Sequence, residues 1–286
     1  MARAHRQDPG DRGLKQGGGV DGARIGVFDS GVGGLTVLAA LRRRLPAAQL
    51  LYAADSAHAP YGERSADYVL ARSRALTRFL LDEGAQAVVV ACNTATALAI
   101  DALRRDWPAV PFVGIEPAVK PALADAASVA VLATPATLAS ARFGALLAAH
   151  GGTHAPRLQP CPGLADAIET AGANAPRTRA LVAELCAPLR GCTRVVLGCT
   201  HYPLVAEAIR ATLGAVELLD PADAVAAQTA RVTRALAAPE PGPALRCWSN
   251  GDVRRLQRVA RDCGLGEVAV TPLPDTAAQP APSAAN

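Results

Sequence analysis

Short apolar runs that end in small polar residues alternate with stretches of helical periodicity along most of this 286-residue chain. In the first half the runs are "RIGVFDS", "AQLLYAADS", "AVVVACN" and "PFVGIEP". Between them lie "LTVLAALRRRL" and "ADYVLARSRALTRFLLDEG", which carry apolar residues at helical spacing, the second closed by Gly84. Strands that alternate with helices predict an α/β fold whose mostly parallel sheet is flanked by helices.

The same order of strand, small polar turn and helix recurs in the second half of the chain. "SVAVLATPATLAS" has the layout of "RIGVFDSGVGGLT", and "VVLGCTHYP" has that of "VVVACNTAT". Val129 follows Ile25 by 104 residues and Cys199 follows Cys92 by 107, which indicates an internal duplication. We therefore expect two pseudo-symmetric α/β domains with the active site in the cleft between them.

The predicted domain limits follow from this repeat. The first domain is expected to take in residues 24–115 together with 225–271, because "GPALRCWSNGDVRRLQRVARDCGLGEVAVTPL" is typical of a last helix and strand that return to the first half. The second domain is expected to take in residues 116–224. The Arg- and Gly-rich residues 1–23 and the Pro- and Ala-rich residues 272–286 are predicted to be disordered tails.

Composition narrows the class of protein. Hydrophobic residues make up 50% of the chain, charged residues 19% and aromatic residues only 3%, so Ala, Val and Leu must fill a sizeable core. No apolar run reaches the roughly 18 residues of a transmembrane helix, and the N-terminus lacks the apolar core of a secretory signal. We therefore expect a cytoplasmic protein with no membrane partner. The net charge is +4, but few aromatic residues lie among the arginines, so nucleic-acid binding is not expected.

The motifs argue against several cofactors. "DSGVGG" lacks the third glycine of a dinucleotide-binding loop, because Thr36 stands in that place, and it lacks the lysine of a phosphate-binding loop. We expect this turn to present its backbone N–H groups to a carboxylate instead. Neither Lys15 nor Lys120, the two lysines of the chain, stands where a pyridoxal-phosphate Schiff base would be expected. The chain is therefore predicted to need no cofactor.

The seven cysteines form no C-x-x-C pair, and reduced thiols are expected. Cys199 and His201 form a C-x-H pair, but no second pair has zinc-binding spacing, so no metal site is predicted. Cys92 and Cys199 each follow an apolar run and precede polar residues. The others are expected to be small buried hydrophobes: Cys161, Cys186, Cys192, Cys247 and Cys263.

Polar residues at the ends of the predicted strands mark the candidate site, because ligands of open α/β sheets bind beyond the carboxyl ends of the strands. These residues are Asp29, Ser30, Cys92, Asn93, Thr134, Cys199, Thr200 and His201. A helix start beside each cysteine is expected to lower the pKa of its thiol. Two thiols on opposite sides of one carbon could remove a proton on one face and deliver one on the other, with Asp29 and His201 as their proton-exchange partners.

Seven stretches give the chain a close resemblance to the glutamate racemases of the aspartate/glutamate racemase superfamily. They are "IGVFDSGVGGLTVL", "YAADSAHAPYGERS", "VVVACNTATA", "IEPAVKPA", "VAVLATPATLAS", "VVLGCTHYPL" and "LLDPADAVA", and they run from about Ile25 to about Val225. The resemblance implies a cofactor-independent interconversion of L- and D-glutamate that supplies D-glutamate for peptidoglycan. It also implies two pseudo-symmetric α/β domains with the site between them.

The same resemblance implies roles for residues of this chain. Cys92 is expected to act on D-glutamate and Cys199 on L-glutamate, with Asp29 and His201 as their catalytic partners. The residues expected to bind substrate are Asp29-Ser30, Tyr61-Gly62, Asn93-Thr94, Thr134, Thr137 and Thr200-His201.

Glu169 matches a family acid near the second thiol and is also expected to bind substrate. Its stretch, "CPGLADAIE", departs from the usual form, because Asp166 stands where proline is common. No motif places an arginine at the site, so an arginine clamp on the side-chain carboxylate of the substrate is not evident.

Other functions stay open at this point. A related enzyme would racemise aspartate or a hydantoin, or would be an arylmalonate decarboxylase, although two cysteines and "CTHYP" favour an amino-acid racemase. A binding protein without important catalysis, such as an inhibitor of DNA gyrase, and a thiol-based redox or metal sensor are alternatives from other classes. The family also implies a homodimer, and in some members activation by a cell-wall precursor.

Overall fold

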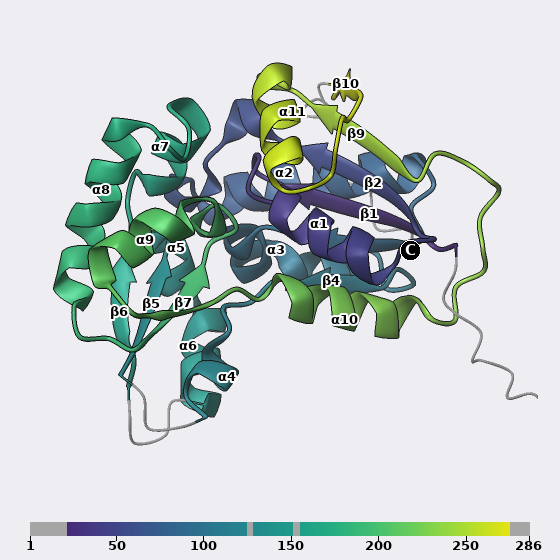
Figure 1. Cartoon of the computed structure of the whole chain (residues 1–286). Helices are drawn as coiled ribbons and strands as arrows, with labels where there is room; N and C mark the ends of the chain where they lie inside the picture. Colours follow the sequence, from purple (N-terminus) through teal and green to yellow (C-terminus); the bar gives the residue numbers. More distant parts are fainter. Residues whose placement is uncertain (1–21, 125–127, 151–154, 275–286) are drawn as a thin grey trace, which may run out of the picture.

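The computed structural model describes residues 22–124, 128–150 and 155–274 (Figure 1). Residues 1–21 of the predicted N-terminal tail, and the predicted C-terminal tail from residue 275, lie outside the described part of the chain. Figure 1 shows two groups of strands, each covered by helices. All strand pairs among these residues are parallel, so the predicted α/β fold with two helix-flanked parallel sheets is confirmed. None of the described helices is long and apolar enough to span a membrane.

Within the described residues, the first sheet has the strand order β10-β9-β2-β1-β3-β4. Its strands are β1 (Arg24–Asp29), β2 (Gln49–Ala54), β3 (Ala87–Val90), β4 (Phe112–Gly114), β9 (Leu245–Ser249) and β10 (Val270–Pro272). The helices of this half are α1 (Leu35–Arg44), α2 (Ala66–Asp82), α3 (Asn93–Asp106), α10 (Ala222–Thr233) and α11 (Val253–Asp262), with 3-10 turns η1 (Ser56–His58) and η2 (Tyr61–Glu63).

The second sheet has the order β6-β5-β7-β8 in the same part of the chain. Its strands are β5 (Val129–Ala133), β6 (Arg157–Pro160), β7 (Arg194–Gly198) and β8 (Glu217–Leu219). The helices are α4 (Val119–Ala122), α5 (Pro135–Leu138), α6 (Ala141–His150), α7 (Leu164–Thr170), α8 (Pro176–Cys186) and α9 (Ala206–Leu213), with 3-10 turns η3 (Ala187–Leu189) and η4 (Tyr202–Val205). Apolar clusters join α7, α8 and α9 to one face of this sheet and α4 and α6 to the other.

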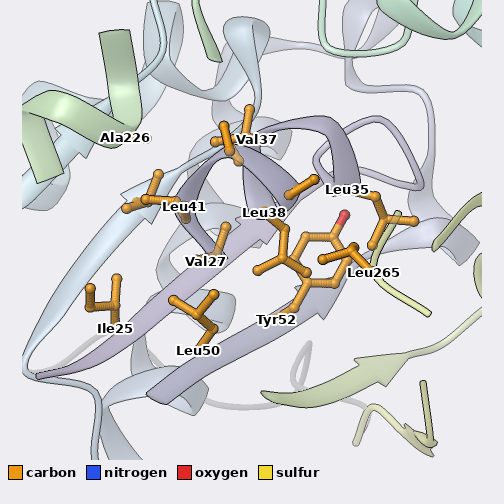
Figure 2. Close-up of a cluster of buried hydrophobic side chains, with 14 of the residues drawn as sticks. Ile25, Val27, Leu35, Val37, Leu38, Leu41, Leu50, Tyr52, Ala226 and Leu265 are labelled. Atoms are coloured by element: carbon orange, nitrogen blue, oxygen red, sulfur yellow. The ribbon is translucent and has the colours of Figure 1, made fainter. Parts of the chain in front are cut away.

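Side chains of the first sheet alternate between two cores, one on each face. Figure 2 shows Val27 and Leu50 pointing from the strands towards Leu38 and Leu41 of α1. Phe28, the next residue of β1, points to the opposite face, where α2 and α3 pack. This alternation follows because successive side chains of a strand point to opposite faces. Both faces are buried, which is why these strands are nearly continuous apolar runs in the sequence.

The C-terminal strands join the first sheet, since β9 pairs with β2 and β10 with β9. The predicted domain limits, residues 24–115 with 225–271 and 116–224, stay a prediction; the limit after residue 224 falls inside α10, which packs on α1. Both tail limits differ from the prediction. Ala23 is buried and its carbonyl accepts the N–H of Gln49 over 3.1 Å, so the N-terminal tail cannot include residue 23. Pro272 belongs to β10 and Leu273 is buried, so the C-terminal tail cannot begin at residue 272.

Candidate active site

The carboxyl ends of β1, β3, β5 and β7 bring the predicted site residues together. Asp29 is the last residue of β1, and Cys92 is the N-cap of α3, just after β3. Thr134 and Cys199 directly follow β5 and β7. The two halves of the molecule meet here, since Thr200 Oγ1 donates a hydrogen bond of 3.1 Å to Asp29 Oδ2. The carboxyl ends of the two parallel sheets therefore bring residues that are far apart in the sequence close together.

The Asp29 carboxylate is fully buried and anchored to the glycine-rich turn that follows it. Its Oδ1 accepts the N–H of Ser30 over 2.7 Å, and its Oδ2 accepts the N–H of Gly34. Glycine is needed at position 34 because a Cβ there would lie 2.6 Å from the Asp29 Cβ. Burial raises the pKa of Asp29, while the charge of His201 opposes this shift. The Asp29 carboxylate is therefore a stronger base than an ordinary aspartate.

The glycine-rich turn binds carboxylates of the protein itself. The N–H groups of Ser30 and Gly34 donate to Asp29, and the N–H of Val32 donates to Glu169 Oε1 over 2.6 Å. The expectation that this turn offers its N–H groups to a carboxylate is thus met by two side chains of the chain, one from each half. The turn consequently positions two acids at the site.

Cys92 is buried, and its thiol donates weakly to Ser30 Oγ at 3.8 Å. Burial and the nearby charge of Asp29 raise the pKa of Cys92 well above its usual range, and the N–H of Ala95 at the helix start only partly offsets them. The expectation of a lowered pKa at Cys92 is therefore wrong in sign, because desolvation of a buried thiolate outweighs one helix terminus. A thiolate formed here is a strong base, which suits a weakly acidic C–H bond.

Cys199 lies in a different local structure. The sequence predicts a helix directly after it, but the 3-10 turn η4 comes first and α9 begins only at Ala206. Pro203 lies in the first turn of η4, where its missing N–H leaves no hydrogen bond unmade. The Cys199 sulfur lies 3.7 Å from His201 Nδ1, so an imidazole rather than a helix terminus is the main partner of this thiol.

His201 is held between Cys199 and Glu169 and is only 2% exposed. Its Nε2 lies 2.6 Å from Glu169 Oε1. Burial alone would lower the pKa of His201, but hydrogen bonds to Cys199 and Glu169 outweigh burial and raise the pKa well above its usual range. The protonated imidazole can donate to the sulfur and to the carboxylate at once. His201 is thereby placed to exchange a proton with Cys199.

Glu169 comes from α7 and reaches the first half of the molecule. Its carboxylate accepts both the Val32 N–H and the His201 imidazole, and its side chain is 8% exposed. The structure therefore brings Glu169 to the predicted site, where it holds His201. The departure at Asp166 is tolerated because this residue lies in the first turn of α7, where an acid interacts favourably with the helix dipole.

The remaining predicted residues lie around the same edge. Thr94 Oγ1 is hydrogen-bonded to Thr134 Oγ1 at 3.0 Å and to Thr137 Oγ1 at 3.4 Å, which joins the start of α3 to the turn after β5. Gly62 packs against Thr134, since a Cβ on Gly62 would lie 2.7 Å from the Thr134 Cγ2. Asn93 is buried, and its Oδ1 has no hydrogen-bond partner among the described residues.

The Tyr61 hydroxyl is already engaged within the first half. It donates to Asp55 Oδ2 over 2.5 Å. Burial, followed by the charge of Asp55, raises the pKa of Tyr61 well above its usual range, so the phenol stays protonated. The hydroxyl proton of Tyr61 is thus already used by Asp55.

Sequence reasoning missed the residues that hold Tyr61, namely Asp55, Arg72 and Asn250. A signal for two of them was present. Asp55 ends the run "LLYAADS" as Asp29 ends "RIGVFDS", and Arg72 stands at helical spacing between the apolar Val69 and Leu76.

The cysteines and acids of the described residues form neither a metal site nor a disulfide. No group of three or more His, Cys, Asp or Glu side chains in this part of the chain could hold a metal ion. All seven cysteines are unpaired thiols; six are buried and Cys263 is half-buried.

The profile of the Asp/Glu/Hydantoin racemase family matches residues 30–229, which contain both site cysteines. The chain belongs to this family. The racemase is 48% identical over 244 residues to a glutamate racemase of Ectopseudomonas mendocina, with 83% of this chain and 93% of the relative covered. It is also 48% identical over 250 residues to a glutamate racemase of Pseudomonas aeruginosa, with 84% and 93% covered.

Solved structures of glutamate racemases share the fold of this racemase. The enzyme of Bacillus anthracis matches with a TM-score of 0.78 at 28% identity, over 89% of this chain and 98% of that chain. The enzyme of Escherichia coli, in complex with L-glutamate and the activator UDP-MurNAc-Ala, matches with a TM-score of 0.78 at 29% identity, over 88% and 98%. The resemblance that the motifs indicated is thereby confirmed, and the chain is an isomerase of the racemase type.

Proposed function

We propose that this racemase interconverts L- and D-glutamate by proton transfer between Cys92 and Cys199, without a cofactor. The observation that carries the proposal is that each buried thiol lies close to a titratable side chain that could exchange a proton with it. Asp29 lies near Cys92, and His201 lies 3.7 Å from Cys199. Glutamate is supported by relatives named glutamate racemase at 48% identity and by complexes of the Escherichia coli enzyme with L-glutamate and the Francisella tularensis enzyme with D-glutamate.

The proposed step balances without any other reactant. From L-glutamate, the Cys199 thiolate removes the Cα proton, and the electron pair of the C–H bond stays on the carbon. The Cys92 thiol then delivers a proton to the opposite face, which leaves Cys92 as the thiolate and Cys199 as the thiol. The roles swap when D-glutamate is the substrate, and exchange through Asp29 and His201 resets the two sulfurs.

The buried setting supports this chemistry in two ways. A thiolate whose pKa is raised by burial is a stronger base, as the weakly acidic Cα–H requires. A site closed to water also strengthens the interactions that stabilise the developing carbanion.

Substrate binding is proposed to use the polar groups around the two thiols. The Asp29 carboxylate attracts the substrate ammonium, and the hydroxyls of Thr94, Thr134 and Thr200 bind carboxylates. Because Thr94 and Thr134 are hydrogen-bonded to each other over 3.0 Å, a bound carboxylate would replace that hydrogen bond with its own. Asn93 Oδ1 is buried and offers an acceptor for the ammonium.

The first test follows the Cα proton. Purified enzyme incubated with L- or D-glutamate in heavy water, with no cofactor added, is expected to produce the opposite enantiomer with deuterium at Cα. Cys92→Ala and Cys199→Ala should each lower the racemisation rate by at least about a thousandfold, because each removes one acid–base group. Cys186→Ala, which changes a buried thiol of α8, is the matched control and should leave the rate unchanged.

Two outcomes would contradict this proposal. Full activity in either Cys92→Ala or Cys199→Ala would rule out the two-thiol mechanism. Turnover of L-aspartate or a hydantoin with none of glutamate would rule out the substrate.

The cellular role is part of the same proposal. D-glutamate formed in the cytoplasm would supply peptidoglycan synthesis and so support cell shape. Assays with and without UDP-MurNAc-Ala would test whether this chain, like the Escherichia coli enzyme, has that activator. Analytical ultracentrifugation would test the proposed homodimer, and a DNA supercoiling assay would test an effect on gyrase.

A further inference from the structure

A buried ion-pair network centred on Asp55 lies beside the site. Asp55 directly follows β2, the neighbour of β1, and is fully buried. Its Oδ1 accepts hydrogen bonds from Arg72 Nη2 and Asn250 Nδ2, each of 2.7 Å. Its Oδ2 accepts from Arg72 Nε at 2.9 Å and from the Tyr61 hydroxyl at 2.5 Å. These hydrogen bonds use the full acceptor capacity of the carboxylate.

Arg72 occupies an unusual position for a charged residue. It is 4% exposed and lies on the face of α2 that also carries the buried Val69 and Leu76. A buried ion pair adds little stability over a well-packed apolar pair, so its presence points to a requirement for fixed geometry. Arg72 meets Asp55 through two parallel N–H groups, which fixes the plane of the carboxylate as a lysine could not.

The network leads from Arg72 to the site through Tyr61. The Tyr61 side chain packs in the same apolar cluster as Cys92, close enough that a thiolate at Cys92 would raise the pKa of the Tyr61 phenol. The next residue, Gly62, fits closely against Thr134 of the second half. If the Asp55 carboxylate were displaced, the Tyr61 side chain that packs near Cys92 would therefore move. The backbone turn at Gly62, which faces Thr134, would move with it.

We propose that Arg72 is a positioning residue for the racemisation reaction. Through Asp55 it holds the Tyr61 hydroxyl, and through Tyr61 it holds the backbone at Gly62 against the substrate. Asn250, which follows β9, adds the C-terminal part of the chain to the same network. This role rests on the proposed function, because it concerns how the site binds glutamate.

The test measures kcat and KM separately in both directions. Arg72→Met is expected to raise KM for glutamate about tenfold while kcat changes less than about threefold, because the binding turn is misplaced but both thiols remain. Arg72→Lys keeps the charge with a single point of contact and should fall between wild type and Arg72→Met. Because the two enantiomers have equal free energies, kcat/KM must fall by the same factor in both directions, which checks each data set.

Arg74→Met is the matched control. Arg74 lies on the same helix and forms a partly buried ion pair with Asp106, with its Nε 2.7 Å from Oδ2. This variant removes an ion pair of α2 that has no contact with Asp55, so KM should stay within about twofold of wild type.

Two further variants separate positioning from stability. Tyr61→Phe removes only the hydroxyl that Asp55 accepts, so it tests the same link even if Arg72→Met fails to fold; it too should raise KM. The double variant Asp55→Asn with Arg72→Met leaves no unpaired buried charge and should regain part of the unfolding midpoint that Arg72→Met loses, while KM stays raised.

The proposal is overturned by a wild-type KM in Tyr61→Phe or Arg72→Met. It is also overturned if KM in the double variant recovers together with stability, since that is what a purely structural ion pair predicts. Failure of the proposed function can be told apart from these results, because the wild-type enzyme itself would then not racemise glutamate. In that case the positioning role of Arg72 is overturned as well.

Discussion

At the scale of single residues, burial and hydrogen bonds together decide the protonation states of the site. Burial raises the pKa of both Asp29 and Cys92, whereas hydrogen bonds to Cys199 and Glu169 raise that of His201 against the effect of burial. The resting site therefore favours a neutral thiol at Cys92 and a charged imidazole beside Cys199. In the proposed mechanism, the Cys92 thiol delivers its proton from this state when L-glutamate is the substrate.

The raised pKa of His201 makes part of the folding stability depend on pH. A histidine with a folded pKa above its ordinary value of 6.5 contributes stability that is fully present below 6.5 and is lost as the pH rises through the folded pKa. Wild type should therefore exceed His201→Asn in unfolding free energy most clearly below about pH 6.5, and the difference should shrink at alkaline pH. Urea denaturation across this range measures it.

His150→Asn, at the end of α6, controls for the loss of a histidine elsewhere. A difference between wild type and His201→Asn that grows as the pH rises would contradict the hydrogen-bonded, charged imidazole inferred here.

At the scale of the elements, glycines in the turns set how closely the two halves approach. A Cβ on Gly33 would lie 2.6 Å from His201 Nδ1 and 2.7 Å from Thr200 Oγ1. Gly33 and Gly62 do not have the positive φ that only glycine adopts readily, so space and not backbone conformation requires glycine there. These turns of the first half thus fit closely against candidate-site residues of the second half.

Gly33→Ala should therefore damage catalysis more than folding. The added methyl group must displace His201 or Thr200, and we expect kcat/KM for glutamate to fall by about a hundredfold. Steady-state racemisation assays measure this effect, and circular dichroism checks that the secondary structure is retained.

Gly144→Ala is the matched control, because a Cβ at this position in α6 meets no atom within 4 Å. It should keep wild-type activity and raise stability by about 0.5–1 kcal/mol, since alanine favours a helix over glycine. Equal activity in both alanine variants would contradict the close fit at Gly33.

At the scale of the whole molecule, contacts outside the site also join the two halves. Arg142 of α6 is paired with Asp101 of α3 over 3.0 Å, and Glu63 Oε1 accepts the N–H of Gly163 over 2.9 Å. These contacts are partly exposed, and such pairs contribute little individually. A substrate that contacts both halves should therefore add substantially to their association.

L-glutamate should raise the unfolding temperature of Cys92→Ala, a variant expected to bind substrate without turning it over. A ligand that binds only the folded state stabilises it by about 2.7 kcal/mol at a hundredfold excess over its Kd. Differential scanning calorimetry measures the shift. L-lysine, which lacks the side-chain carboxylate, should give a smaller one, and equal shifts with both amino acids would contradict recognition of that carboxylate.

Local patterns were enough to predict the type of fold and which residues gather at the candidate site. The apolar runs and helical stretches predict the alternating elements because each depends on neighbours a few residues away. The positions of Asp29, Cys92 and Cys199 were predictable for a related reason: parallel strands place their carboxyl ends at one edge, so a polar residue at the end of an apolar run becomes a candidate for the site.

Long-range packing decided what the sequence by itself left open. The sign of the pKa shift at Cys92 depends on how completely distant segments exclude water from it, and the partner of Glu169 is a backbone N–H at Val32, 137 residues away. The pairing of Arg72 with Asp55 joins a helix face to a strand end. Desolvation and such contacts arise only when the two sheets come together, because no local periodicity encodes them.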